Sequence, residues 1–476
     1  MRLNGCLSDI EFYSNPHDPS AIYAEVIVPK ILSGGDEYTM FVEFDDPKLK
    51  SYLRACVKPK VDEKTTVPMI LEAAKDILTF RSNPDKVSPS VRTAGSLTNG
   101  LIEYDLNNDA HQYVRITKLG WTVSKKAKHK FLKRNTMAAQ VTPQQTSNNL
   151  LTLLSPFINT DRDSFVLLTT WLVQAFCKGS HSAAIIKAPQ GSGKTVLTKM
   201  CRAIVDPSRL DASVMSLKKD DLFTTLSNSY FLAFDNLAEE FTKETSDILC
   251  SAITGATIAK RLLYTTNELG VYELHNTLII NGIDTIPTES DLASRCLLFN
   301  LKNIDENKRR PISELEAQFT SALPEIMGAV FNTLSQAMTI IPNLHPAKLP
   351  RMADSYKEML AIGIALGISE EDFCQIYNNN LTLIDKERSN IAIVQAIKEF
   401  MSSDCVKGRS IEGKVTDLYN KISTSYSGHK SDLPKSASHF SQKVKRETRA
   451  LNAAGIVCNF DDTYSDGTHL KIIKNK

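Results

Sequence analysis

A glycine-rich turn near the middle of the chain has the residue types and spacing of a phosphate-binding loop. It follows an apolar run at 183–188, and Lys194 and Thr195 then open a segment with helical spacing. In a loop of the pattern G-x-x-x-x-G-K-[ST], successive backbone N–H groups and the N-terminus of the helix face the phosphates. Ala188 occupies the first position of that pattern. The residues predicted to bind the nucleotide are Pro189, Gln190, Gly191, Ser192, Gly193, Lys194, Thr195 and Val196.

A second apolar run ends in an acid, as a nucleotide site of this kind requires. Residues 230–234 are apolar and Asp235 follows them. We predict that Lys194 contacts the β- and γ-phosphates of ATP, and that the Thr195 hydroxyl and the Asp235 carboxylate hold Mg²⁺. The alternative is a buried strand that simply ends in an aspartate.

A third apolar run, at 277–280, also ends in a polar residue. We expect Asn281 to position the attacking water beside the γ-phosphate. The alternative is an asparagine that only forms a turn before Gly282.

Four short apolar runs with helical segments between them predict a parallel α/β sheet. They cover 183–188, 230–235, 277–280 and 297–301. Ligands of such sheets lie at the C-terminal ends of the strands, which is where the glycine-rich turn and the polar residues described above fall.

The flanks of this sheet show other patterns. Strands are predicted at 21–28, 38–44, 101–106, 112–116 and 120–123, and helices at 67–80, 150–177, 312–334 (interrupted at Pro324) and 353–366. The predicted regions are a mixed α+β N-terminal domain at 1–135, a linker with helices at 136–182, the ATP-binding core at 183–303, a helical domain at 304–387 and a C-terminal domain at 388–476.

The C-terminal region has the element order of a winged helix. The predicted elements are helices at 391–402, 410–424 and 436–454, then strands at 455–460 and 469–473. In such a module a basic helix enters the major groove of duplex DNA and the hairpin contacts phosphates, whereas other modules of this shape dock proteins. The cations predicted to contact DNA are Lys443, Lys445, Arg446 and Arg449.

A second basic run occupies 125–134. It is either a solvated surface or a contact with a phosphate backbone. Across all 476 residues, 56 Lys and Arg against 54 Asp and Glu give a formal net charge of +2. Any nucleic-acid surface must therefore be local.

Cysteine spacing and hydropathy indicate the cellular location. The nine cysteines form no C-x-x-C pair and no zinc-type cluster, which favours reduced thiols over a zinc ribbon. No run of eighteen apolar residues occurs. We expect a cytoplasmic protein, in a bacterium or an infected host cell, with no membrane association.

The ordered set of motifs resembles superfamily III helicases. Residues 249–264 resemble the segment that follows the acidic strand in phage and poxvirus primase-helicases, and 291–295 resembles the segment with the arginine finger. Asn281 matches the sensor 1 position. From about residue 65 the chain also resembles ATP-binding helicase-like proteins of phages and mobile elements, without a recognisable primase domain. The segments that carry this second resemblance are 120–121, 234–237, 281–283 and 350–354.

The resemblance implies an AAA+ core, usually a hexameric ring that uses ATP to translocate on single-stranded DNA in a central channel. It implies that Arg295 reaches the γ-phosphate bound by a neighbouring subunit, where an arginine stabilises transition-state charge. The alternative for Arg295 is an ordinary ion pair. The family's channel hairpin follows Arg261 here, so Lys260 and Arg261 at its base are the expected DNA contacts.

The chain departs from the family pattern in two places. Asn236 stands where many members carry a second acid, which leaves the general base unassigned. Glu239 and Glu240 are nearby, and the alternative for them is a solvated polar loop or helix start. The hairpin tip contains Glu268 and no Lys or Arg.

We therefore expect an α/β protein with an AAA+ (P-loop) core, an ATP-dependent DNA helicase or replication initiator of a phage or mobile genetic element that forms a homo-hexamer. The expected catalytic residues are Lys194, Asp235, Asn281 and Arg295. The alternatives are an AAA+ switch ATPase that remodels protein partners, or an origin-binding protein without unwinding activity.

Overall fold

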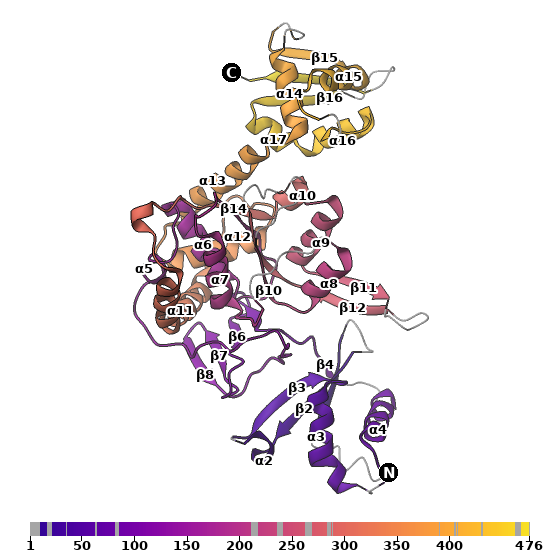
Figure 1. Cartoon of the computed structure of the whole chain (residues 1–476), viewed down its shortest axis with the longest axis vertical. Coiled ribbons are helices and arrows are strands. Elements are labelled where there is room, and N and C mark those ends of the chain that lie inside the picture. Colours follow the sequence, from indigo (N-terminus) through magenta and orange to yellow (C-terminus); the bar gives the residue numbers. More distant parts are fainter. Residues whose placement is uncertain are drawn as a thin grey trace.

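The elements fall into three groups along the long axis of the molecule. An N-terminal group lies at one end, a large body in the middle, and a C-terminal group at the other end (Figure 1). This computed structural model describes residues 10–16, 21–34, 36–61, 64–80, 85–210, 218–235, 241–261, 269–282, 287, 289–389, 391–403, 406, 408–429, 432–461 and 468–475.

The N-terminal group is a four-stranded sheet with helices on it. Its strands are β1 (Ile10–Ser14), β2 (Ile22–Val28), β3 (Tyr38–Glu43) and β4 (Asp85–Lys86), in the order β3-β2-β1-β4. Its helices are α2 (Lys30–Ser33), α3 (Pro47–Tyr52), the π-helix η1 (Leu53–Val57), the 3₁₀ turn η2 (Lys58–Lys60) and α4 (Val67–Phe80). The predicted strands at 21–28 and 38–44 and the predicted helix at 67–80 are confirmed.

A second, antiparallel sheet belongs to the central body. It runs in the order β5 (Thr93–Ser96), β6 (Leu101–Asp105), β7 (Tyr113–Thr117) and β8 (Gly120–Ser124). The last three strands match the prediction. The indole N–H of Trp121 donates to Asn332 Oδ1 at 2.9 Å, and its ring packs on Phe331. The sheet therefore shares the core of the central body and not that of the N-terminal sheet.

The predicted parallel sheet forms the centre of the molecule. Its strands are β9 (Ala183–Lys187), β10 (Phe231–Phe234), β13 (Thr277–Gly282) and β14 (Cys296–Asn300). They pair in parallel in the order β10-β13-β9-β14. All four strands thus end at one edge, as expected from the apolar runs.

Both faces of this sheet are buried, because alternate residues of each strand face different cores. Ala184 and Ile186 face one hydrophobic cluster, and Ala183 and Ile185 face the other. The first cluster contains residues of α6 (Arg162–Gln174), α7 (Lys194–Val205), α11 (Ile312–Ile340) and α12 (Ala353–Ala365). The second contains residues of α8 (Lys219–Ser227), α9 (Lys243–Thr254) and α10 (Ser290–Ala293).

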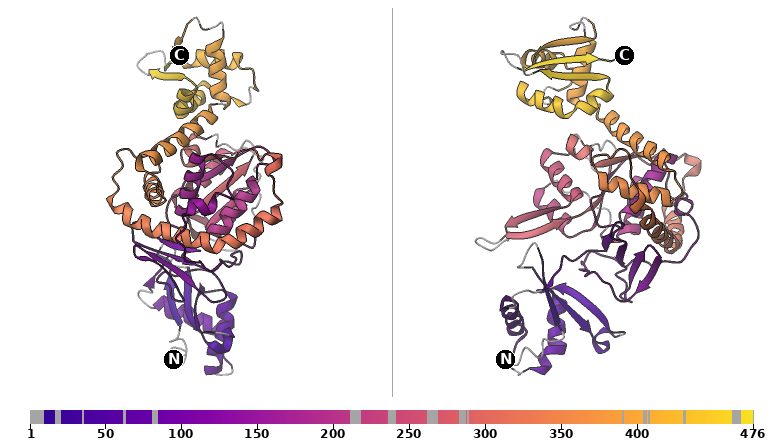
Figure 2. Two further views of the ribbon diagram at one scale, coloured as in Figure 1. Left: turned by 90° about the vertical axis from the view of Figure 1, so that its left-hand side faces the viewer. Right: turned by 180° about the vertical axis from the view of Figure 1, so that it is seen from behind.

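A two-stranded hairpin projects from the body beside α8 and α9 (Figures 1 and 2). It pairs β11 (Ala256–Arg261) with β12 (Leu269–Leu274) in antiparallel register. The channel hairpin was expected after Arg261, but its first strand already contains residues 256–261. Of the predicted turn at 266–270, residues 266–268 lie outside the described residues and Leu269 and Gly270 belong to β12.

The long helix α11 continues through Pro324, where an interruption was expected. A proline in a helix removes one N–H donor and crowds the carbonyl four residues earlier. That carbonyl belongs to Thr320, which is exposed, so water can satisfy it. The Pro324 carbonyl itself accepts a hydrogen bond from the Gln144 backbone N–H at 2.8 Å. The remaining connections are α5 (Leu150–Leu154), η3 (Glu306–Lys308) and η4 (Ile341–Asn343).

The C-terminal group follows α13 (Glu370–Arg388), which runs out of the body (Figure 1). Its elements are α14 (Ala392–Ser402), β15 (Ser410–Lys414), α15 (Val415–Ser425), α16 (Ala437–Arg446), α17 (Thr448–Ala453), β16 (Ile456–Asp461) and β17 (His469–Lys474). The strands form one antiparallel sheet in the order β15-β17-β16.

Two expectations for this group are wrong. The start of the helix predicted at 410–424 is strand β15, because residues 410–414 pair along β17. The basic helix predicted at 436–454 is two helices that meet at Glu447. The Glu447 carboxylate is buried in an ion pair with Arg388, and this contact from the end of α13 coincides with the break.

Candidate nucleotide site

The glycine-rich turn links the C-terminal end of β9 to the first residue of α7. Gly191 and Gly193 have φ angles of 79° and 86°, the left-handed region that favours glycine. The Ser192 hydroxyl donates to the Pro189 carbonyl at 2.7 Å and closes the turn. Ala188 is buried at the start of the turn, so a side chain at this first position is accommodated.

Lys194 is the first residue of α7, and its ammonium group lies against the turn. It donates to the carbonyl oxygens of Ala188 at 2.5 Å and Pro189 at 2.9 Å. Burial lowers the pKa of Lys194, and the nearby Asp235 carboxylate opposes that shift. The cation is therefore held where an anion in the loop would meet it.

Thr195 and Asp235 meet across the site. The Thr195 hydroxyl donates to Asp235 Oδ1 at 3.0 Å, so the start of α7 and the end of β10 present two oxygen ligands side by side. An oxygen pair of this kind suits Mg²⁺, which prefers carboxylate and hydroxyl oxygens and retains several waters. The residues present thus fit the predicted metal.

Asn281 lies at the corresponding end of β13. Its side chain is fully buried, and its amide Nδ2 donates to the Thr198 hydroxyl at 2.8 Å. Together with Thr195 and Asp235 it lines a cavity of about 1180 Å³, so the predicted residues from the start of α7 and from the ends of two strands are brought together. All of the predicted nucleotide-binding residues except Pro189 line this cavity, and Pro189 contributes the carbonyl described above.

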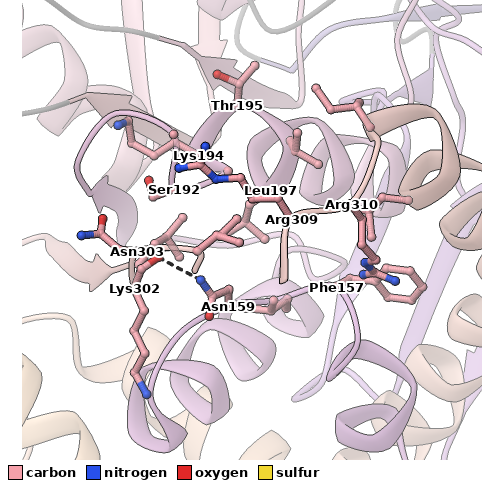
Figure 3. A pocket seen from close by; sticks show the side chains of 18 of the residues that line it. Phe157, Asn159, Ser192, Lys194, Thr195, Leu197, Lys302, Asn303, Arg309 and Arg310 are labelled. Carbon is pink, nitrogen blue, oxygen red and sulfur yellow. Dashed lines mark hydrogen bonds between the residues drawn. The ribbon is translucent and has the colours of Figure 1, made fainter. Parts of the chain in front are cut away.

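Sequence reasoning missed the opposite wall of the cavity. It comes from the loop before α6, from the segment 302–311 after β14 (Figure 3), and from the start of α11. The wall combines apolar and cationic side chains: Phe157, Ile304, Leu315, Lys302, Arg309 and Arg310. Arg309 and Arg310, which are adjacent but separated from the fourth apolar run by residues 302–308, were the only signal for this wall, and no motif contains them.

Arg295 lies at the other edge of the sheet. It directly precedes β14, and its carbonyl accepts from the N–H of Ala183, the first residue of β9. Because a strand rises about 3.3 Å per residue, the whole length of β14 separates Arg295 from its own glycine-rich turn. In the single chain its guanidinium pairs with Asp291 at 2.6 Å. Arg351 pairs with the same carboxylate at 2.5 Å.

The expected DNA contacts occupy two separate places. Lys260 and Arg261 end β11, opposite Gly270 and Leu269. They lie at the far end of the paired strands and not at the base as predicted, because the base is the pair Ala256 and Leu274, next to α9 and β13. Asn236, Glu239 and Glu240, which bear on the general base, lie outside the described residues.

The four C-terminal cations do not share one helix face. Lys443, Lys445 and Arg446 belong to α16 and Arg449 to α17. Arg446 and Arg449 line a cavity of about 340 Å³ together with Arg351 and Arg388 of the central body. The Lys445 ammonium lies 4.7 Å from the centroid of the Phe460 ring.

The basic run at 125–134 is partly neutralised within the chain. Lys125 pairs with Asp36 at 2.5 Å, Arg134 pairs with Glu43 at 2.7 Å, and Lys130 pairs with Glu25. These three acids belong to the N-terminal group. The run therefore connects the N-terminal group to the body, and these cations are not free for a phosphate backbone.

Comparison with known proteins supports part of the expected resemblance. Residues 148–375 match the family model of the actinomycete integrative conjugative element replication protein. The match covers just under half of the chain and includes the whole cavity lining. Over this part the chain resembles replication proteins of mobile elements, as predicted. No curated protein matches the sequence.

Two solved structures show weak likeness to the chain. One, described as SCCmec type IV Cch, an active helicase, is 13% identical over 98% of this chain and 92% of that chain, with a TM-score of 0.49. The other is the apo structure of the NrS-1 C-terminal region, 11% identical over 100% of this chain and 99% of that chain, with a TM-score of 0.39. Within the part of the chain that the structure describes, no helix is long and apolar enough to cross a membrane.

Proposed function

We propose that the chain is an ATPase of the P-loop class that drives DNA replication of a mobile genetic element as a helicase or initiator. The observation that carries the proposal is the hydrogen bond between Thr195 and Asp235 beside the glycine-rich turn. It joins a hydroxyl and a carboxylate from distant parts of the sequence at the strand ends where Lys194 also lies.

Each residue at the strand ends then has a chemical task. The backbone of the turn and Lys194 bind the phosphates of ATP. Thr195 and Asp235 hold Mg²⁺, which when bound offsets the charge that develops on the phosphates. Asn281, which lines the cavity at the end of β13, orients the water that attacks the terminal phosphate.

The remaining parts are proposed for DNA and for assembly. The C-terminal group acts as a winged helix on duplex DNA, and the hairpin with Lys260 and Arg261 contacts single-stranded DNA in the channel of a homo-hexamer. Arg295 supports this arrangement, since it lies too far from its own turn to act there and close enough to the sheet edge to serve a neighbour.

The test is ATP hydrolysis by the full chain, with and without single-stranded DNA and with Lys194→Ala as the control. We expect Mg²⁺-dependent turnover that single-stranded DNA stimulates and that the variant loses. Turnover indifferent to DNA would favour a protein-remodelling ATPase, and no turnover above that of Lys194→Ala would favour an origin-binding protein.

A further inference from the structure

The segment 302–311 brings a guanidinium close to the glycine-rich turn. A β-carbon built on Gly191 would lie 3.9 Å from Arg309 Nη2, and one built on Gly193 would lie 3.6 Å from Ile304 Cδ1. The segment is anchored at its start, because the Lys302 N–H donates to the Asn159 carbonyl and the Asn159 side-chain amide donates to the Lys302 carbonyl. The backbone N–H of Arg309 donates to Glu306 in the 3₁₀ turn η3.

Adjacent arginines leave this segment in different directions. Arg310 turns toward Phe157 (Figure 3), where it donates to the Pro156 carbonyl at 3.0 Å and to Gln318 Oε1 at 2.8 Å. Arg309 extends toward Ser192 and Lys194 (Figure 3). Among the described residues, the Arg309 guanidinium makes no hydrogen bond and no ion pair, so its donors face the cavity.

The charge of the cavity points to an anion with several negative charges. Of the described lining residues, four are cationic and two are acidic: Lys194, Lys302, Arg309 and Arg310 against Asp235 and Asp305. Asp235 already accepts from Thr195, and Arg310 is bonded away from the turn. Lys302 extends away from the turn (Figure 3), so Lys194 and Arg309 are the cations left at the turn.

We propose that Arg309 binds the polyphosphate of the nucleotide held by its own subunit, acting together with Lys194 at the glycine-rich turn. The planar fork of a guanidinium matches two phosphate oxygens at once, which an ammonium cannot do. This assignment rests on the proposed ATPase function and is distinct from the role of Arg295, which serves a neighbouring subunit.

The consequence is a link between the nucleotide and α11. Arg309 and Arg310 are consecutive, and Arg310 is bonded to Gln318 of α11 and to the loop before α6. Phosphate binding by Arg309 therefore fixes the segment 302–311, and through Arg310 it fixes the contacts of that segment with α11 and with the loop before α6. Nucleosides without phosphates do not engage it.

The experiment measures binding of AMPPNP, ADP and adenosine to the full chain by calorimetry with Mg²⁺. Arg309→Ala is expected to weaken AMPPNP binding by about tenfold to a hundredfold, the size typical of a charge-assisted hydrogen bond. Adenosine binding is expected to stay within about twofold of wild type, below the effect of one such bond. Arg309→Lys retains the charge without the planar fork, so its affinity for AMPPNP is expected to lie between those of wild type and Arg309→Ala.

Arg310→Ala is the matched control, since it removes the same charge from the neighbouring residue. Any loss it causes is expected to be equal for AMPPNP and adenosine. An equal, phosphate-dependent loss in both variants would show a general charge effect and overturn the assignment to Arg309. Thermal unfolding of each variant checks that it folds.

Two other outcomes separate the proposals. If Lys194→Ala loses AMPPNP binding while Arg309→Ala binds like wild type, the role of Arg309 is wrong and the ATPase stands. If wild type binds AMPPNP no better than Lys194→Ala, both fail together. With ATP held below the dissociation constant of Arg309→Ala, a mixture of Arg309→Ala and Lys194→Ala subunits is expected to hydrolyse ATP no faster than its parents, because each lesion affects its own subunit's site. Faster hydrolysis by the mixture would place Arg309 in a neighbour's site instead.

Discussion

Thr195 and Asp235 are connected by one hydrogen bond. The role of this pair in binding Mg²⁺ can be tested separately from nucleotide affinity. We predict that Asp235→Ala loses Mg²⁺-dependent hydrolysis but still binds nucleotide, because the turn and Lys194 are unchanged. Asp235→Asn is the control, since it retains an acceptor for Thr195 without the charge that the metal needs. Hydrolysis and nucleotide binding measured over a Mg²⁺ titration decide the question. Near-normal turnover in Asp235→Ala would contradict the metal assignment.

Glu358, on α12, gives a pH-dependent prediction about stability. Burial raises its pKa to about 7; the hydrogen bond from Gln174 opposes this shift and Asp354 adds to it. The folded state therefore binds a proton that the unfolded state releases at lower pH, so this contribution to stability falls as pH rises from about 4.5 to about 7.

Glu358→Gln is neutral at every pH and retains an acceptor for Gln174. We predict that it raises the unfolding temperature relative to wild type at pH 8, where the carboxylate would have to ionise, and does so less at pH 5. Thermal unfolding at the two values tests this, with exposed Glu371→Gln on α13 as the control. The same gain at both pH values would show that the Glu358 charge is not the cause.

At the scale of elements, the C-terminal group is anchored by Arg388 at the end of α13. The guanidinium of Arg388 forms a buried ion pair with Glu447, between α16 and α17, and donates to the Pro287 carbonyl at 3.2 Å. Removing one partner of such a pair leaves an uncompensated buried charge, which is strongly destabilising. The group is thus connected to the body by a contact as well as by chain continuity.

We predict that this group binds duplex DNA and that affinity falls steeply with salt, because phosphate contacts release counterions. A chain ending at Ser389 is expected to lose duplex binding while retaining ATP hydrolysis. Within the full chain, Lys443→Ala with Lys445→Ala should reduce the slope of log affinity against log salt by about two. Fluorescence anisotropy over a salt series measures both. Unchanged duplex affinity in the shortened chain would contradict the assignment.

The same elements show what the sequence could and could not predict. The strands of the parallel sheet were predictable because each is a local apolar run that ends in a polar residue. Strand β15 was not, because residues 410–414 have little apolar character and become a strand only by pairing with β17. Helical spacing continues from α16 into α17, and the break coincides with the contact from Arg388.

The residues of the candidate site also divide into those that the sequence could predict and those that it could not. Lys194, Thr195, Asp235 and Asn281 were predictable, because the ends of parallel strands meet at one edge whatever the details of packing. Arg309 was not, since it is exposed, belongs to no motif, and reaches the turn only because the segment 302–311 folds back over it.

At the scale of the whole molecule, Arg295 can be tested by mixing subunits. We predict that Arg295→Ala binds ATP nearly normally and that hydrolysis falls by roughly a thousandfold or more, as for other arginines acting in trans. Mixing it with Lys194→Ala should restore some activity, because certain interfaces combine an intact turn with an intact arginine. A mixture as inactive as its parents, despite demonstrated co-assembly, would contradict action in trans. Loss of folding in Arg295→Ala would favour the ion pair with Asp291 as its only role.

The placement of the turn and Arg295 at opposite edges of one sheet constrains the symmetry of any active assembly. In a two-fold dimer residue i contacts residue j and j contacts i, so one contact surface would have to span both ends of the sheet to bring each turn to the other subunit's Arg295. A heterologous contact, with one end of a subunit's sheet meeting the opposite end of the next, joins a turn to an Arg295 without that requirement. Such contacts repeat until the rotation closes a ring or continues as a helix. Each interface then holds one site, so a closed ring has as many sites as subunits, and an open chain has one fewer.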